Sequence, residues 1–242
     1  MGPEVWIPYC GVAPSAGEWR WTIDPVLIAV LITAALTIGW RMSGRERLLG
    51  LAAVLTLAVG FVSPLCALSS ALFAARTVHH VILVALAAPL IAWSLPRSQS
   101  GSLSLATAIQ AVVFWAWHAP ALYATALSND AVYWLMQASL LASSVGFWAG
   151  VRRASAPSAV VHLLIAMVAM GLLGALITFA GQPLYAPHFL TTGSWGLTPL
   201  EDQQAAGLIM WAPAAAVYLV AALVILGRWI GPDVRAAEGR PA

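Results

Sequence analysis

Histidine and cysteine side chains give this sequence its strongest metal-binding chemistry. Two histidines are adjacent, His79 and His80, and a third is His118. The two cysteines are Cys10 and Cys66. Neutral imidazole is a favoured ligand of Cu, Zn and Fe, and thiolate is a soft ligand, so these residue types indicate a metal site. The sequence has no Cys-x-x-Cys or His-Glu-x-x-His pattern, so such a site would be assembled from separate segments.

The two cysteines allow two interpretations. In an oxidising compartment Cys10 and Cys66 form a disulfide. Alternatively they are thiolate ligands of cuprous copper, with Met136 or Met210 adding a thioether. Sequence spacing does not decide between the two.

The positions of the histidines limit which of them can meet. His79 and His80 point about 100° apart on a helix, so only one of them faces a given site. Either one can also be a hydrogen-bonded core residue. His118 shortly precedes Pro120, so the helix should bend or end there and present His118 at the mouth of the bundle. We interpret the nearby Tyr123 as part of an aromatic belt at the membrane surface.

The stretch GLTPLEDQQAAGLIMWAP places four polar side chains at the start of a long apolar run. Thr198 as N-cap, Pro199 at the first position and Glu201 completing a capping box predict a helix start. Asp202 and Gln203 then lie inside the first turns. Either they turn inward as functional groups, or Asp202 only stabilises the positive end of its helix.

Composition defines the class of protein that must position these residues. The chain has 242 residues, of which 61% are hydrophobic and 8% charged, against about 25% charged in soluble domains. This predicts an integral membrane protein. All basic residues are arginine, which excludes a lysine Schiff base or nucleophile, and the net charge of +2 does not favour nucleic acid. The N-terminus lacks the basic start and apolar core of a cleaved signal peptide.

The predicted fold class is all-α, a polytopic membrane helix bundle with seven transmembrane helices. A bilayer core takes about 20 apolar residues per helix. The seven stretches that qualify are 24–40, 48–68, 78–95, 103–123, 131–150, 158–181 and 204–230. We therefore expect an outer segment 1–23, a membrane domain 24–230 and a cytoplasmic tail 231–242.

The distribution of arginine orients this bundle. Nine arginines fall on one side of the seven spans, and only Arg20 and Arg76 fall on the other. By the positive-inside rule the N-terminus is outside and the C-terminus is cytoplasmic. Four of the five histidines and both cysteines then lie on the outer side, and only His162 lies at the cytoplasmic end.

Five motifs along the chain resemble one known family. In order they are YCGVAP with WTIDP, HHVILVALAAPL, WHAPALY, GQPLYAP and DQQAAGLIMW. Together they resemble the CtaG-type cytochrome c oxidase assembly factors, and the resemblance covers nearly the whole chain. It implies a seven-helix protein of the bacterial inner membrane that is not an enzyme. It also implies cytochrome c oxidase subunits as partners and copper (Cu⁺) delivery or insertion on the outer face.

Carried over residue by residue, the resemblance implies a candidate site. The positions that match the family pattern are His80, His118, Asp202, Gln203, Gln204, Gly207, Met210 and Trp211. Many members have a histidine where this chain has Arg76, and histidines at the start of the fifth span where it reads NDAVYWLMQ. The expected copper ligands are therefore His80, His118 and Met210, with His79, His188, Cys10 or Cys66 compensating. Asp202, Gln203, Gln204 and Trp211 are expected to support these ligands from behind. Asp202 and Gln203 would orient a histidine ligand and hold the outer ends of the helices together.

Two other functions remain open at this point. A b-type haem protein would use His80 and His118 as axial ligands. A metal-free assembly scaffold would leave the histidines incidental. A coupled transporter is disfavoured, because no span carries a carboxylate near the bilayer midplane.

Overall fold

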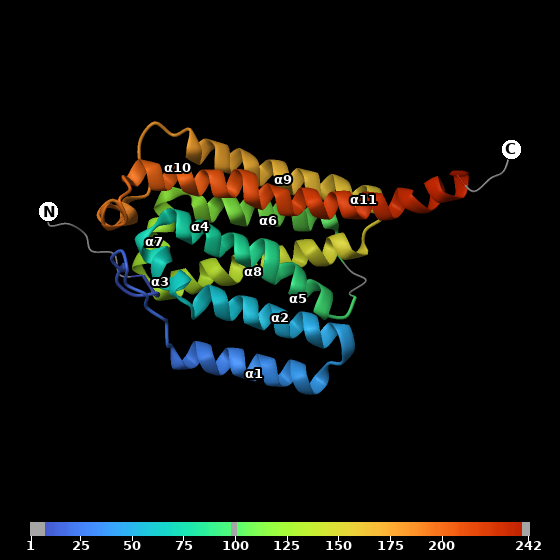
Figure 1. The fold of residues 1–242 in the computed structure, drawn as a ribbon, viewed down its shortest axis with the longest axis horizontal. Coiled ribbons are helices and arrows are strands. Elements are labelled where there is room, and N and C mark those ends of the chain that lie inside the picture. Colours follow the sequence, from blue (N-terminus) through green and yellow to red (C-terminus); the bar gives the residue numbers. More distant parts are fainter. Residues whose placement is uncertain (1–7, 98–100, 239–242) are drawn as a thin grey trace.

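The structure, a computed structural model, describes residues 8–97 and 101–238, and all the regular secondary structure in those ranges is helical (Figure 1). The α-helices are α1 (Pro25–Arg41), α2 (Gly44–Phe61), α3 (Pro64–Ala71), α4 (Phe73–Val81), α5 (Ala88–Ser94), α6 (Leu103–His118), α7 (Pro120–Ser128), α8 (Asp130–Arg153), α9 (Ala156–Thr178), α10 (Pro199–Ile209) and α11 (Ala215–Glu238). Two π-helical segments, η1 (Ile82–Ala87) and η4 (Met210–Ala214), and two 3₁₀ turns, η2 (Ala186–His188) and η3 (Thr192–Trp195), complete the elements.

The helix starts follow the capping residues of the sequence. The Asp24 carboxylate accepts a hydrogen bond from the Leu27 amide at 2.8 Å to begin α1, and Asn129 accepts two at the start of α8. The capping box of Thr198 and Glu201 is present at the start of α10, as predicted. Local sequence thus fixes where the helices begin.

Proline shapes two of the long helices. The helix Phe73–Ser94 contains the π-helical segment η1 just before Pro89, and the helix that starts at Pro199 contains η4 around Pro213. Proline lacks the amide hydrogen that would continue the α-helical ladder, and a π-helical turn accommodates the missing bond. Both helices therefore continue past their prolines instead of ending there.

Each of the seven predicted stretches corresponds to helix in the structure, but not all pass as membrane spans by length and apolar character. Three described helices do, Phe73–Ser94, Ala156–Thr178 and Pro199–Gly231. Two bent pairs, α2 with α3 and α6 with α7, raise the number to five. Large apolar side chains are exposed all along the bundle, such as Trp40 at 87%. A surface of this kind needs lipid against it.

The helices run back and forth between two ends (Figure 1). The first end, called the loop end here, holds the N-terminal segment, α3, α7 and the long connection 179–198. The other end holds the turns with Arg41, Arg97 and Arg153, as the arginine distribution predicts. The expected segment 1–23 is described from residue 8 only. The expected tail 231–242 continues α11 as helix to Glu238, and its last four residues lie outside the described ranges.

Candidate functional site

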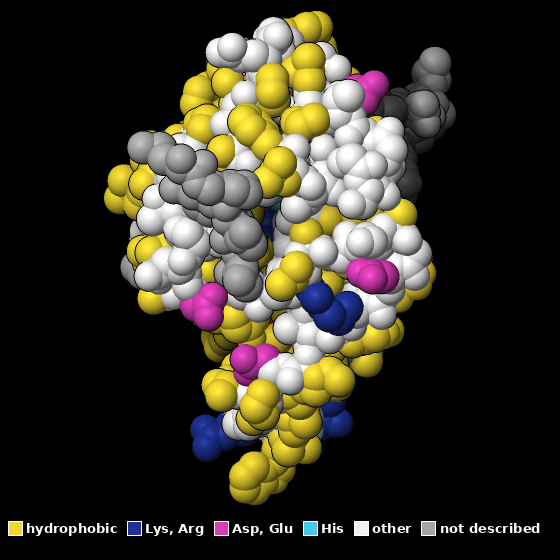
Figure 2. All heavy atoms as spheres, turned by 90° about the vertical axis from the view of Figure 1, so that its left-hand side faces the viewer, with side chains coloured by type: hydrophobic (Ala, Val, Ile, Leu, Met, Phe, Trp, Pro, Cys, Tyr) yellow, Lys and Arg dark blue, Asp and Glu magenta, His cyan; other side chains and the backbone are white. Residues whose placement is uncertain are grey.

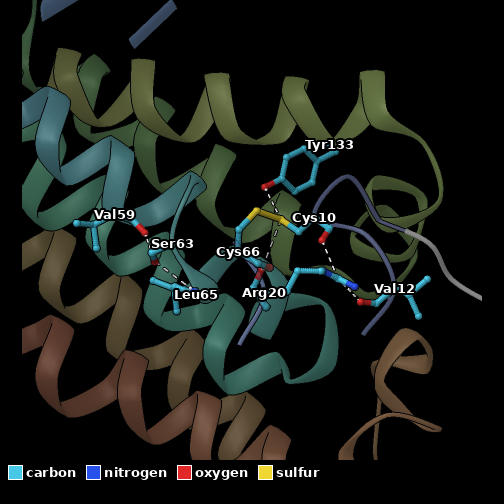
Figure 3. Close-up of a disulfide and its surroundings, with 9 residues drawn as sticks. Cys10, Val12, Arg20, Val59, Ser63, Leu65, Cys66 and Tyr133 are labelled. Carbon is cyan, nitrogen blue, oxygen red and sulfur yellow. Dashed lines mark hydrogen bonds between the residues drawn. A yellow bond between two sulfur atoms is a disulfide. The ribbon is translucent and has the colours of Figure 1, made fainter. Parts of the chain in front are cut away.

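The cysteines are joined to each other in a disulfide at the loop end (Figure 3). Cys10 and Cys66 have a Cα–Cα distance of 5.4 Å and tie the N-terminal segment to α3. Arg20 holds the same segment by donating from its guanidinium to the backbone oxygens of Cys10 and Val12. In this state neither sulfur is a thiolate. The first of the two interpretations of the cysteines is therefore the one the structure adopts.

His80 and His118 meet in the interior of the loop end. His80 comes from α4 and His118 is the last residue of α6, and their ring centroids lie 5.4 Å apart, edge to face. The exposed fractions of their side chains are 0% and 2%. Nδ1 of His118 lies 2.7 Å from the Phe114 carbonyl oxygen, which can only accept, so this nitrogen carries the proton. Nε2 of His118 and both ring nitrogens of His80 have no hydrogen-bond partner among the described residues.

His118 corrects one detail of the sequence-based prediction. The chain does break there, with a bend of 73° between α6 and α7, as the following proline predicts. However, His118 is buried and not presented at an open mouth, because the connection 179–198 covers it. The Tyr185 hydroxyl of that connection donates to the His118 carbonyl oxygen at 2.8 Å.

His79 points away from this pair. Its ring packs edge to face on Phe61 of α2, with centroids 4.8 Å apart, and lies against Gly60 of the same helix. A Cβ on Gly60 would come within 3.1 Å of the His79 ring. Adjacent histidines thus face different neighbours, as helical geometry predicts. His79 does not share a site with His118.

His188 is brought in by the connection between α9 and α10. Its Nε2 lies 2.6 Å from the hydroxyl of Tyr123, and its side chain is 2% exposed. Burial, with a further contribution from the charge of Arg76, lowers the pKa of His188 to about 3. Tyr123 is fully buried, so its interpretation as an aromatic belt residue was wrong. It packs edge to face on Phe73, with centroids 5.2 Å apart, at the centre of the loop end.

Asp202 holds the ends of two helices together, as the sequence-based interpretation expects. It is fully buried, and its two carboxylate oxygens accept hydrogen bonds from the amides of Phe73 at 2.7 Å and Ala74 at 3.1 Å. These amides begin α4, which has no side-chain cap of its own. Asp202 of α10 therefore caps a different helix, the one that carries His80. It contacts the metal-binding candidates only through the helix that it caps.

The remaining expected support residues divide into buried and outward-facing ones. Gln203 accepts from the Leu184 amide at 2.7 Å and donates to the Ile177 carbonyl oxygen at 3.2 Å, so it fastens the connection to α9. Met210 is fully buried at the start of η4, a segment that packs against α4. Gln204 is half-buried, and Trp211 is 44% exposed and packs on Phe179. Trp211 thus lies on the bundle surface and does not support a ligand.

The sequence-based list lacks the most unusual residue of this region. Arg76, one turn before His80 on α4, is fully buried, and its guanidinium carbon lies 5.2 Å from the centroid of the Tyr133 ring. The only sequence signal was its position in place of a family histidine. In all, the described ranges contain no group of three or more His, Cys, Asp or Glu side chains arranged to hold a metal ion. Among the expected histidine and cysteine ligands, His80 and His118 are the two from separate helices whose rings meet, with centroids 5.4 Å apart.

Comparison with known proteins decides the family. The model of the cytochrome c oxidase caa3 assembly factors (Caa3_CtaG) matches residues 102–231, just over half of the chain. The chain belongs to this family. The matched region includes His118 and Asp202 but not α4 with His80. No curated protein and no solved structure matches the chain. Its association with cytochrome c oxidase biogenesis is thus established at the level of the family.

Proposed function

We propose that this oxidase assembly factor handles cuprous copper at its loop end, with His80 and His118 as the imidazole ligands. The observation that supports this is the meeting of two buried imidazoles from separate helices, with three ring nitrogens left without hydrogen bonds. Buried polar groups in a bilayer are expensive unless they are paired or bind something. A copper ion would bind Nε2 of His118 and one ring nitrogen of His80. The protein would work in a bacterial inner membrane with the loop end outside and oxidase subunits as clients.

The residues of the pair fit the proposed cargo. The proton that His118 donates to the Phe114 carbonyl fixes its tautomer and leaves the lone pair of Nε2 free. A backbone acceptor behind a ligating imidazole is the usual arrangement in metal sites. Imidazole suits copper, and Met210, which is buried on a segment packed against α4, would add a thioether. The role is that of a carrier, which needs no catalytic group.

The haem alternative has no structural support. The rings of His80 and His118 are already within the range of edge-to-face contact, so a macrocycle does not fit between them. The scaffold alternative has one observation in its favour. Asp202 and Gln203 act on backbone groups, which is what an assembly that only holds its helix ends together would need.

A cuprous titration of the detergent-purified protein against a competing chelator, with a visible spectrum of the same sample, tests the proposal. We expect one tightly bound ion, lost in a variant with both His80→Ala and His118→Ala. The matched control is His162→Ala, at the opposite end, where the ring bonds to Ser104 and to the Ser158 carbonyl oxygen. Absence of binding by the wild-type protein would favour the scaffold, and a Soret band would favour haem.

A further inference from the structure

Arg76 is a buried cation without a partner. Its side chain is fully buried, and none of its three guanidinium nitrogens has a hydrogen-bond partner among the described residues. A guanidinium presents five N–H donors and stays charged at all physiological pH. An unpaired charge in a low-dielectric interior is among the most unfavourable groups a protein can contain.

The carboxylate of this region does not neutralise Arg76. Among the buried side chains that the structure describes, Asp202 is the one that carries a carboxylate. Both of its oxygens accept hydrogen bonds from the amides that begin α4. It forms no hydrogen bond with Arg76. The π face of Tyr133 faces the guanidinium at 5.2 Å, which offsets only part of a full charge.

Apart from Asp202, the groups around Arg76 in the described part of the chain are neutral hydroxyls and imidazoles, which can accept hydrogen bonds but carry no negative charge. Its charge acts on His79, His80 and His188, which surround it, and on the hydroxyls of Tyr123 and Tyr133. Thr77 Oγ1 and the side-chain amide of Gln137 are buried without hydrogen-bond partners as well. A buried guanidinium whose described neighbours are neutral defines a site for a ligand that brings negative charge.

We infer that the interior of the loop end binds one small monovalent anion, of the size and charge of chloride, at the guanidinium of Arg76. The anion supplies the missing negative charge and accepts from the unpartnered donors around it. The full burial of Arg76 favours a small anion, and Tyr9 of the disulfide-tied N-terminal segment stacks on Tyr133, with centroids 5.2 Å apart. Outside the grey atoms, Figure 2 shows mostly apolar and uncharged atoms at this end, with isolated charged side chains. The inference does not rest on copper binding.

The test is the melting temperature of the full-length protein in detergent, in chloride, bromide and gluconate buffers of equal ionic strength. At a hundred times its Kd, a halide should raise the melting temperature by about 5–10 °C over gluconate. Arg76→Gln should abolish this rise. The control Arg152→Gln removes a guanidinium that donates to the Ala92 and Leu95 carbonyl oxygens of α5, and it should keep the rise.

Arg76→Gln also changes packing, so the comparison of the wild-type melting temperature in the three buffers decides the question without the variant. Equal melting temperatures in all three buffers would overturn the inference. A halide effect that persists in Arg76→Gln would place the anion elsewhere and overturn the assignment to Arg76. In crystals grown with bromide, an anomalous peak beside the Arg76 guanidinium would confirm the site, and its absence at saturating bromide would refute it.

Discussion

Replacing Asp202 tests whether one buried carboxylate holds the start of α4. Asp202→Ala leaves the amides of Phe73 and Ala74 without the acceptor that now lies at 2.7 and 3.1 Å. A buried donor left unsatisfied costs about 1–3 kcal/mol, so the loss for the pair should be about 3 kcal/mol. Asp202→Asn keeps one carbonyl acceptor and loses the charge, and it should cost about 1 kcal/mol.

The assay is reversible unfolding in mixed micelles titrated with a denaturing detergent. Glu201→Ala is the matched control, since it removes the neighbouring carboxylate, which is exposed and caps only its own helix. Its loss should not exceed about 1 kcal/mol. If Asp202→Ala is no more destabilising than Glu201→Ala, the two hydrogen bonds do not hold α4 and our reasoning about the loop end fails.

Two further predictions concern the neighbouring elements. His188 has a pKa of about 3 when folded and the usual value of about 6.5 when unfolded, so protons bind the unfolded chain preferentially between these values. The stability that His188 contributes is then fully present above pH 6.5 and falls by about 1.4 kcal/mol per pH unit as the pH drops toward 3. When the free energy of unfolding is measured at several pH values, its slope against pH should be shallower in His188→Gln. An unchanged slope would contradict the assignment. A Cβ on Gly207 would lie 2.6 Å from the Gly174 carbonyl oxygen and 2.8 Å from the Thr178 amide nitrogen, so Gly207→Ala should force α9 and α10 apart and cost about 2 kcal/mol or more. Gly146→Ala, with no atom within 4 Å, is its control and should be neutral or slightly stabilising in the same unfolding assay.

The parts of the fold that the sequence predicts well are those with local causes. The capping box at Thr198 and Glu201 and the break before Pro120 depend on residues within four positions of each other, and both are confirmed. The grouping of four histidines and both cysteines at one end follows from the order of the apolar stretches alone. The family also follows from motifs, and the family model confirms it.

The site depends on contacts that sequence does not encode locally. The Phe73 amide that Asp202 accepts from lies 129 residues earlier in the chain. The position of Asp202 in the first turn of α10 suggested that it stabilises α10, whereas it caps α4. Tyr123 has the composition of a membrane-surface aromatic, and only its contact with His188, 65 residues later, shows that it is buried. Arg76 was set aside as a departure from a family pattern, because burial without a counter-ion is visible only in three dimensions.

Arg76 and His80 are four residues apart on α4, so the two proposals act on each other. Side chains at this spacing share a helix face, and a cuprous ion on His80 would lie roughly 8 Å from the guanidinium. At an effective dielectric constant of about 20, two unit charges at that distance repel by about 2 kcal/mol, or roughly thirty-fold in affinity. An anion at Arg76 removes this repulsion, so anion and copper should favour each other's binding by the same factor. In anion-poor gluconate, Arg76→Gln should therefore bind cuprous copper more tightly than the wild-type protein, and equal or weaker binding would show that the charge of Arg76 does not reach the histidine pair.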